Sequence, residues 1–220
     1  MKRHLFTGVL ALALLGAAAI AYADDTSQIL KAVDQLQAEV AQMQAQIKDL
    51  AAKIDLLQSA FAPQVGEAQN KARQKKMRAL YEERAKADEK LFTDVQLKQI
   101  EKLYSVANAK DKWNSDEAKT NLAVVVQQFP KSNRAGCGVL YLAQMEDNKA
   151  EKEKLLLDAI NNHADSAYGD GVQVGALARF LLAEMYRKAG KTADADRLTA
   201  EIKDKYPGAI NHNGELLVNP

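Results

Sequence analysis

The chain has 220 residues, of which 47% are hydrophobic, 27% are charged and only 6% are aromatic. Its formal net charge is +1 at pH 7, and it would become −1 if a cleaved leader removed Lys2 and Arg3. A nucleic-acid partner would require a basic surface, so this balance argues against one. Helix-forming residues dominate, prolines are few and no run of alternating β-branched residues occurs. The composition therefore predicts an all-α protein.

Residues 1–23 have the order of a secretory signal peptide. Basic residues precede an apolar run over 9–20, and Ala21-Tyr22-Ala23 follows in the form of a cleavage site. We expect a mature N-terminus at Asp24 and a periplasmic or secreted product that has no membrane insertion after signal cleavage. The alternative is an uncleaved membrane anchor, for which the apolar stretch is slightly shorter than the span of about 20 residues that a bilayer needs.

Residues 24–62 predict a coiled-coil oligomerisation helix. Its apolar residues alternate in spacings of four and three: Ile29, Val33, Leu36, Val40, Met43, Ile47, Leu50, Ile54, Leu57 and Phe61. A strict seven-residue repeat implies helices wound around each other in a left-handed supercoil. The flanking positions are polar or small, whereas a helix that packs on its own globular domain usually has a wider apolar stripe. The pattern therefore predicts an oligomer, either a dimer or a trimer.

Residues 63–92 predict a hinge followed by a charged connector helix. Pro63 cannot continue the hydrogen-bonding pattern of a helix, and Gly66 adds conformational freedom. The connector carries one basic cluster, made of Lys71, Arg73, Lys75, Lys76 and Arg78. This cluster is either a solvated helix face or a contact with an acidic envelope polymer or partner.

Residues 93–210 predict a helical solenoid, because helical segments alternate with turn signals. The segments end in similar ways, at Phe129-Pro130, at His163 and at Tyr206-Pro207. Phe129 and His163 are 34 residues apart, which is the period of tetratricopeptide repeats. His163 and Tyr206 are 43 residues apart, so we expect an insertion over residues 167–175.

The last repeat matches the tetratricopeptide pattern best. Its pattern residues, which we predict to pack the repeat, are Leu182, Ala183, Tyr186, Gly190, Ala195 and Pro207. Small residues at Ala183 and Ala195 would allow two helices to approach closely, with Tyr186 filling the gap between them. Gly190 would make the turn, and Pro207 would end the second helix.

The order of these segments resembles a known family. A signal peptide, a heptad coiled coil, a connector and C-terminal repeats that end in Phe129-Pro130-Lys131-Ser132 and Tyr206-Pro207 are similar to the periplasmic TolA-binding, cell-division coordinator family known as YbgF or CpoB. The resemblance implies trimerisation through the coiled coil and a TolA-like partner. It also implies a link between the Tol envelope machinery and peptidoglycan synthesis.

The sequence shows no chemistry that would predict an enzyme. His163 and His212 have no cysteine or histidine partner at the spacing of metal ligands. Cys137 is the only cysteine and reads as a small buried packing residue rather than a nucleophile, with intermolecular pairing as the minor alternative. Residues 169–171 resemble a phosphate loop only faintly, because the Gly-Lys-Ser/Thr ending is absent, and are interpreted as a turn between helices. We predict no catalytic, cofactor or metal site.

The final segment, residues 211–220, allows two interpretations. It forms either a small hairpin about Asn213-Gly214 or a mobile tail.

The sequence thus favours a non-catalytic periplasmic adaptor that self-associates and binds envelope proteins through its repeats, with a role in envelope maintenance or cell division. The alternative is an accessory assembly subunit of an envelope secretion or enzyme complex.

Overall fold

The computed structural model describes residues 26–109 and 111–218. The chain divides into two units between Gln64 and Val65. The predicted signal peptide, residues 1–23, lies outside the described residues. Within those residues, no helix is long and apolar enough to cross a membrane.

Helices form nearly all of the regular structure in the part of the chain that is described, which confirms the predicted all-α class. In chain order they are α2 (Thr26–Leu91), α3 (Asp94–Ser105), the 3₁₀ helix η1 (Val106–Asn108), α4 (Asp116–Gln128), α5 (Asn133–Met145), α6 (Lys149–Asn162), α7 (Val174–Lys188) and α8 (Thr192–Lys205).

The hinge predicted at Pro63 and Gly66, within residues 62–66, is not a break in the helix. α2 continues through this stretch and holds Pro63 in its interior. Proline removes one hydrogen bond, the one that would reach the carbonyl of Ser59, and a long helix keeps its remaining bonds on both sides. Gly66 has no atom within 4 Å of an added Cβ, so the structure does not require glycine there. The division between the two units falls just after, between Gln64 and Val65.

Polar caps explain where the helices of the second unit begin. Thr93 and Gln96 form a reciprocal capping box at the start of α3. The Ser115 and Ser132 hydroxyls each accept a backbone hydrogen bond of 3.1 Å at the start of α4 and α5. The Asn148 side chain accepts one of 2.9 Å at the start of α6. Each cap contributes about 1 kcal/mol to helix stability.

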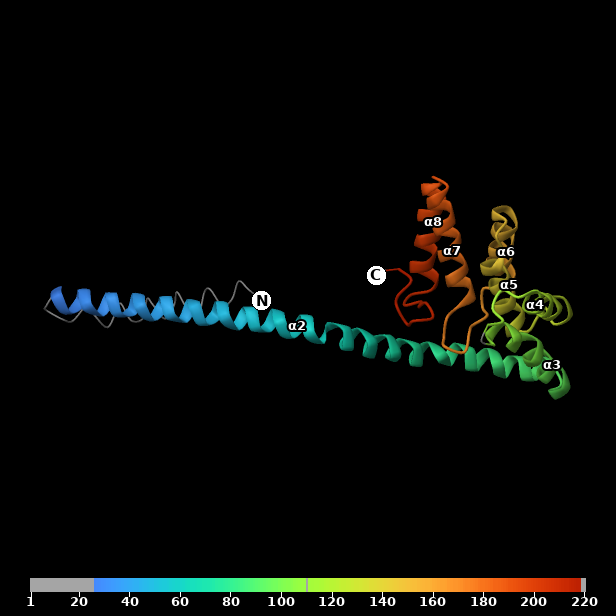
Figure 1. The fold of residues 1–220 in the computed structure, drawn as a ribbon, viewed down its shortest axis with the longest axis horizontal. Coiled ribbons are helices and arrows are strands. Elements are labelled where there is room, and N and C mark those ends of the chain that lie inside the picture. The colour runs from blue at the N-terminus through green and yellow to red at the C-terminus, as the bar shows by residue number, and fades with distance from the viewer. Residues whose placement is uncertain (1–25, 110, 219–220) are drawn as a thin grey trace. The chain divides into compact units, whose positions relative to one another are not determined.

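The six α-helices after α2 form three successive helical hairpins, α3/α4, α5/α6 and α7/α8. Each helix contacts the next, and α5 also contacts α3 and α7, so the hairpins stack in one row (Figure 1). Fully buried side chains lie between them: Leu122, Leu140, Leu156, Leu182 and Ile202. Each such side chain stabilises the fold by about 1.5–3 kcal/mol.

The predicted connector is part of the second unit rather than a separate link. The Asp88 carboxylate accepts the Asn133 backbone N–H at the start of α5, at 3.1 and 2.9 Å from its two oxygens. Arg134 of α5 donates to the Tyr81 hydroxyl at 3.1 Å. The C-terminal part of α2 therefore packs along the base of the helical hairpins, as the green segment in Figure 1 shows.

Two loops of the second unit share one backbone pattern. In the first, residues 166–174, the Gly171 N–H donates to the Tyr168 carbonyl and the Tyr168 N–H to the Val172 carbonyl, at 2.9 and 2.8 Å. In the second, residues 209–217, Gly214 and Asn211 take the corresponding places. We name these loops hairpin 1 and hairpin 2. Both are three-residue turns that end in a glycine with positive φ, +91° and +79°.

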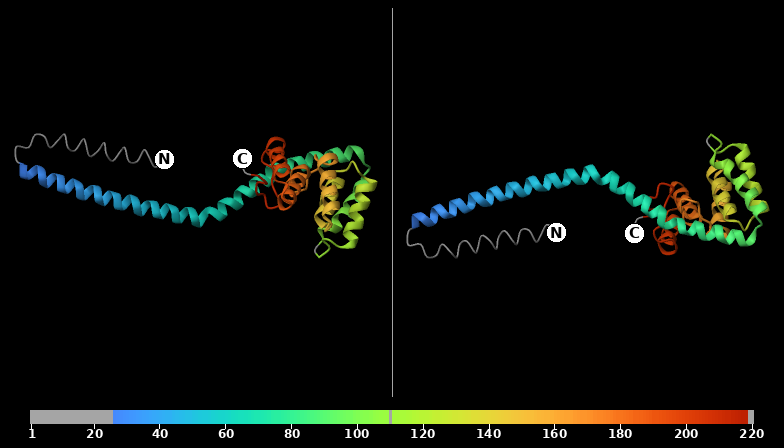
Figure 2. Two further views of the ribbon diagram at one scale, coloured as in Figure 1. Left: turned by 90° about the horizontal axis from the view of Figure 1, so that it is seen from above. Right: turned by 90° about the horizontal axis from the view of Figure 1, so that it is seen from below.

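Hairpin 1 occupies the region where the sequence predicted an insertion. Hairpin 2 shows that the chain after α8 adopts the first of the two predicted forms, a hairpin about Asn213-Gly214, closed by a bridge between Ile210 and Leu216. Both hairpins contact α2, and the views of Figure 2 show this end of the chain beside α2 from above and below.

Candidate binding surfaces

The predicted oligomerisation residues lie along one helix of the first unit and are largely uncovered. Their side chains are 38–57% exposed at Val33, Met43, Ile47, Leu50, Ile54, Leu57 and Phe61. The remaining three, Ile29, Leu36 and Val40, are half-buried. Such a row of large apolar side chains gains free energy only when another surface covers it.

The predicted repeat-packing residues lie in the α7/α8 hairpin. Leu182, Ala183 and Ala195 are buried where the two helices meet. Gly190 has φ +76° and makes the turn between them, and Pro207 is exposed two residues after α8 ends.

Tyr186 has a different place from the one its pattern predicts. It is half-buried, and its hydroxyl donates to the Glu153 carboxylate of α6 at 2.6 Å. Tyr186 therefore connects α7 to the preceding helical hairpin, α5/α6. That hydrogen bond raises the pKa of Tyr186 to about 12.

A cavity of about 550 Å³ lies between α5, α6 and α7. We name it the Trp113 groove, because the side chain of Trp113, which is 46% exposed, forms part of its wall. Trp113 packs edge-on against the Tyr141 ring at a centroid distance of 5.0 Å. The apolar lining continues over Ala143, Leu156, Leu181 and Met185.

The rim of the Trp113 groove carries charge. Among the described residues, Lys149, Lys152 and Lys188 form no ion pair, against one unpaired carboxylate, Asp147, whereas Glu184 is paired with Arg187 at 2.7 Å. The unpaired cations leave the rim favourable for an acidic group. This groove was missed from the sequence, although the single tryptophan of the chain in a turn between helices was a signal that could have pointed to it.

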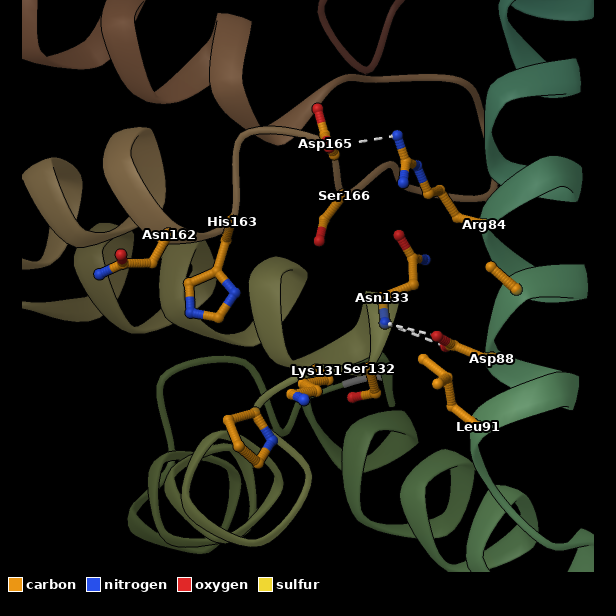
Figure 3. Close-up of a pocket in the computed structure, with 12 residues that line it drawn as sticks. Arg84, Asp88, Leu91, Lys131, Ser132, Asn133, Asn162, His163, Asp165 and Ser166 are labelled. Carbon is orange, nitrogen blue, oxygen red and sulfur yellow. Dashed lines mark hydrogen bonds and ion pairs between the residues drawn. The ribbon is translucent and has the colours of Figure 1, made fainter.

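A second cavity of about 290 Å³ lies at the base of the helical hairpins, where α2 meets the α4–α5 and α6–α7 connections (Figure 3). We name it the Arg84 cavity. Arg84 pairs with Asp165 at 3.4 Å across its upper side, and Asp88 holds the backbone of Asn133 on the other. Lys131 adds a further cation to the lining.

Burial shifts the pKa of two side chains in the Arg84 cavity. The pKa of Asp88 is raised because burial penalises its charged form, although the Asn133 N–H opposes this shift. The pKa of His163 is lowered for the same reason. His163 follows the last residue of α6 and turns its ring toward the cavity, so it is a capping residue that also lines this site.

Several cations of the basic cluster on α2 form ion pairs or hydrogen bonds within the protein. Lys71 pairs with Glu67 at 2.6 Å and Arg78 with Glu82 at 3.5 Å. Arg73 donates to the Gly214 carbonyl at 3.3 Å and so holds hairpin 2. The cluster does not act as one free cationic patch.

Cys137 and His212, which the sequence analysis considered as possible reactive or metal-binding residues, both lie in structural contacts. Cys137 is fully buried, and burial raises its pKa to about 12, which keeps the thiol protonated. His212 contacts Asp170 of hairpin 1 at 2.7 Å, and its ring packs edge-on against Tyr168. In the described part of the chain, no group of three metal-ligating side chains comes together.

A comparison with protein-family models finds no match, and comparisons with curated proteins and with solved structures find none either.

Proposed function

We propose that this protein is a non-catalytic oligomeric adaptor, which self-associates through the helix of its first unit and binds partner proteins through its stacked helical hairpins. The observation that carries this proposal is the uncovered heptad stripe of α2, in which large apolar side chains are 38–57% exposed. A seven-residue repeat matches another copy of itself best, so the occupant of the stripe is a second or third copy of this chain.

The energetics favour assembly. Covering each of the ten stripe residues stabilises the assembly by up to about 1.5–3 kcal/mol, although partly collapsed unfolded chains reduce this value. An isolated helix gains none of it.

The second unit supports the adaptor role. Its three helical hairpins in one row are consistent with a tetratricopeptide-like solenoid, which presents a groove to partner segments. The Trp113 groove combines an apolar lining with unpaired lysines on its rim, and so suits a peptide segment that carries an apolar anchor next to acidic residues.

The resemblance to the YbgF/CpoB family suggests where such an adaptor acts. We propose a periplasmic location, after cleavage of residues 1–23, and an envelope partner related to TolA. The same architecture serves an accessory assembly subunit of a secretion or enzyme complex, and the identity of the bound partner separates the two roles.

Sedimentation equilibrium tests the self-association. We expect the intact protein to be a dimer or trimer at micromolar concentration, and Ile47→Asn to weaken that assembly while the second unit stays folded. Lys48→Asn is the matched control, because Lys48 lies one residue away, outside the stripe, and should leave assembly unchanged. A monomeric wild-type protein would refute the proposal.

Fluorescence of Trp113 can test whether partners bind in the Trp113 groove. The chain contains one tryptophan, so its fluorescence reports on the Trp113 groove alone. Partners captured by crosslinking in intact cells should change this emission when added to the purified protein, and Lys152→Glu should weaken their binding. Partner binding without any change in Trp113 emission would place recognition elsewhere.

A further inference from the structure

Hairpins 1 and 2 dock on α2 in the same way, at sites that are seven residues apart. A methyl group added to Gly171 of hairpin 1 would lie 2.7 Å from the backbone carbon of Met77. One added to Gly214 of hairpin 2 would lie 2.5 Å from the backbone oxygen of Asn70. Seven residues of helix span about 10.5 Å, which is close to the spacing of about 8–10 Å between packed helices. α2 therefore offers one docking position for each helical hairpin.

The next position along α2, seven residues beyond Met77, is Arg84, and no hairpin occupies it. The connection before α5 begins as the other two do, with the Ser132 N–H donating to the Phe129 carbonyl as Ser166 donates to His163. It then passes directly into α5, whereas hairpin 1 intervenes before α7. The Arg84 cavity lies in the place that a third hairpin would fill.

The Arg84 cavity offers polar groups that the fold does not use. Among the described residues, the Lys131 amino group, the His163 ring and the Ser166 hydroxyl form no hydrogen bond or ion pair. The Arg84 pair with Asp165 is weak, because the two side chains are 40% and 82% exposed. The remaining carboxylate, Asp88, is satisfied by the backbone of α5.

We propose that the Arg84 cavity is a second docking site, which receives an acidic turn of a partner polypeptide in the place of a third hairpin. Two cations, Arg84 and Lys131, and two carboxylates, Asp88 and Asp165, line the cavity, and both carboxylates already have partners. An incoming aspartate or glutamate side chain can therefore pair with Lys131 and compete with Asp165 for Arg84. The geometry of hairpins 1 and 2 selects a turn with glycine at its tip, because only glycine allows the two backbones to approach so closely. This site is separate from the Trp113 groove and does not depend on the function proposed for that groove.

A cyclic peptide that carries the sequence of residues 209–217 is a direct probe, because it supplies the glycine turn and an acidic residue, Glu215. Its binding to the intact protein can be followed by the fluorescence anisotropy of a dye on the peptide. We expect saturable binding, and a loss of affinity of about tenfold or more for Arg84→Ala and for Lys131→Ala, since hydrogen bonds to charged groups contribute that much. Lys86→Ala is the matched control, because Lys86 is an exposed cation of α2 outside the cavity lining.

A second variant distinguishes binding of the peptide in the Arg84 cavity from binding at Asn70, where the peptide would displace hairpin 2. Ala87→Phe fills the Arg84 cavity without changing its charge and lies far along α2 from Asn70, so it should abolish binding while thermal stability stays the same. Emission from Trp113 should not change during the titration. Absence of saturable binding, or binding that Arg84→Ala and Ala87→Phe leave intact, would overturn the proposal.

Discussion

Replacing Gly171 with alanine should destabilise the second unit strongly, because two costs coincide at this residue. Its φ of +91° belongs to a region that side chains disfavour, at a cost of about 1–2 kcal/mol. The added methyl group would also lie 2.7 Å from the backbone of Met77, and relieving such overpacking costs about 1–3 kcal/mol. The total of about 2–5 kcal/mol is a large part of the stability of an ordinary domain, about 5–15 kcal/mol.

Gly190→Ala is the matched control. Gly190 has a similar φ of +76°, but no atom lies within 4 Å of its added methyl group. Both substitutions reduce the entropy of the unfolded chain equally. The difference between them therefore measures the contact of hairpin 1 with α2.

Urea denaturation followed by Trp113 fluorescence is the appropriate assay, since the only tryptophan of the chain belongs to the second unit. We expect Gly171→Ala to lower the free energy of unfolding by about 1–3 kcal/mol more than Gly190→Ala. Equal losses for the two variants would show that hairpin 1 does not dock on α2.

Three further predictions concern the buried groups of the second unit. Ala183→Leu should overpack the contact between α7 and α8 and cost about 1–3 kcal/mol in urea denaturation, whereas a neutral result would place Ala183 outside that contact. The raised pKa of Asp88 means that the folded protein keeps a proton which the unfolded chain has already lost. The stability of the wild type relative to Asp88→Asn should therefore fall as the pH rises from about 4 through the raised pKa, and a rise in denaturation experiments would contradict this sign. Cys137 should react with a thiol reagent only on unfolding, and rapid reaction of the native protein would contradict its burial.

The features that the sequence predicted well depend on local patterns. Helix formers, turn signals and polar caps such as Ser132 act within a few residues, so the all-α class could be predicted from them. The heptad stripe is equally visible in the sequence, because its period is a property of one helix. The 43-residue distance from His163 to Tyr206 located the region of hairpin 1, although not its form.

The helix break predicted at residues 62–66 was wrong because α2 is long, although the two units do divide within this stretch. A proline in the sequence indicates the loss of one helical hydrogen bond. It does not indicate how stable the helix is on either side of that residue. The connector was misjudged because the face of α2 that meets the second unit mixes half-buried apolar residues such as Met77 and Tyr81 with polar ones. Gln74 donates to the His212 carbonyl at 2.7 Å and Arg73 to the Gly214 carbonyl, and such polar contacts weaken the apolar pattern of this face.

The groove and the cavity could not be predicted because each depends on residues that only the fold brings together. Trp113 reaches a surface made by three later helices, and Arg84 meets Lys131 and His163 across two connections. Side chains separated by tens of residues share no periodicity, so no sequence pattern joins them.

One long-range signal was nevertheless present in the sequence. Gly171 and Gly214 are 43 residues apart, the same distance that separates His163 from Tyr206. A single insertion would explain only the distance from His163 to Tyr206. A hairpin that recurs in both repeats explains this distance and the one from Gly171 to Gly214. If each repeat can end in a hairpin whose glycine meets the backbone of a shared helix, then that helix must run beside every repeat at intervals of seven residues. The spacing of the glycines thus indicates a repeated hairpin, whereas the contacts of both hairpins with α2 and the empty position at Arg84 are visible only in the structure.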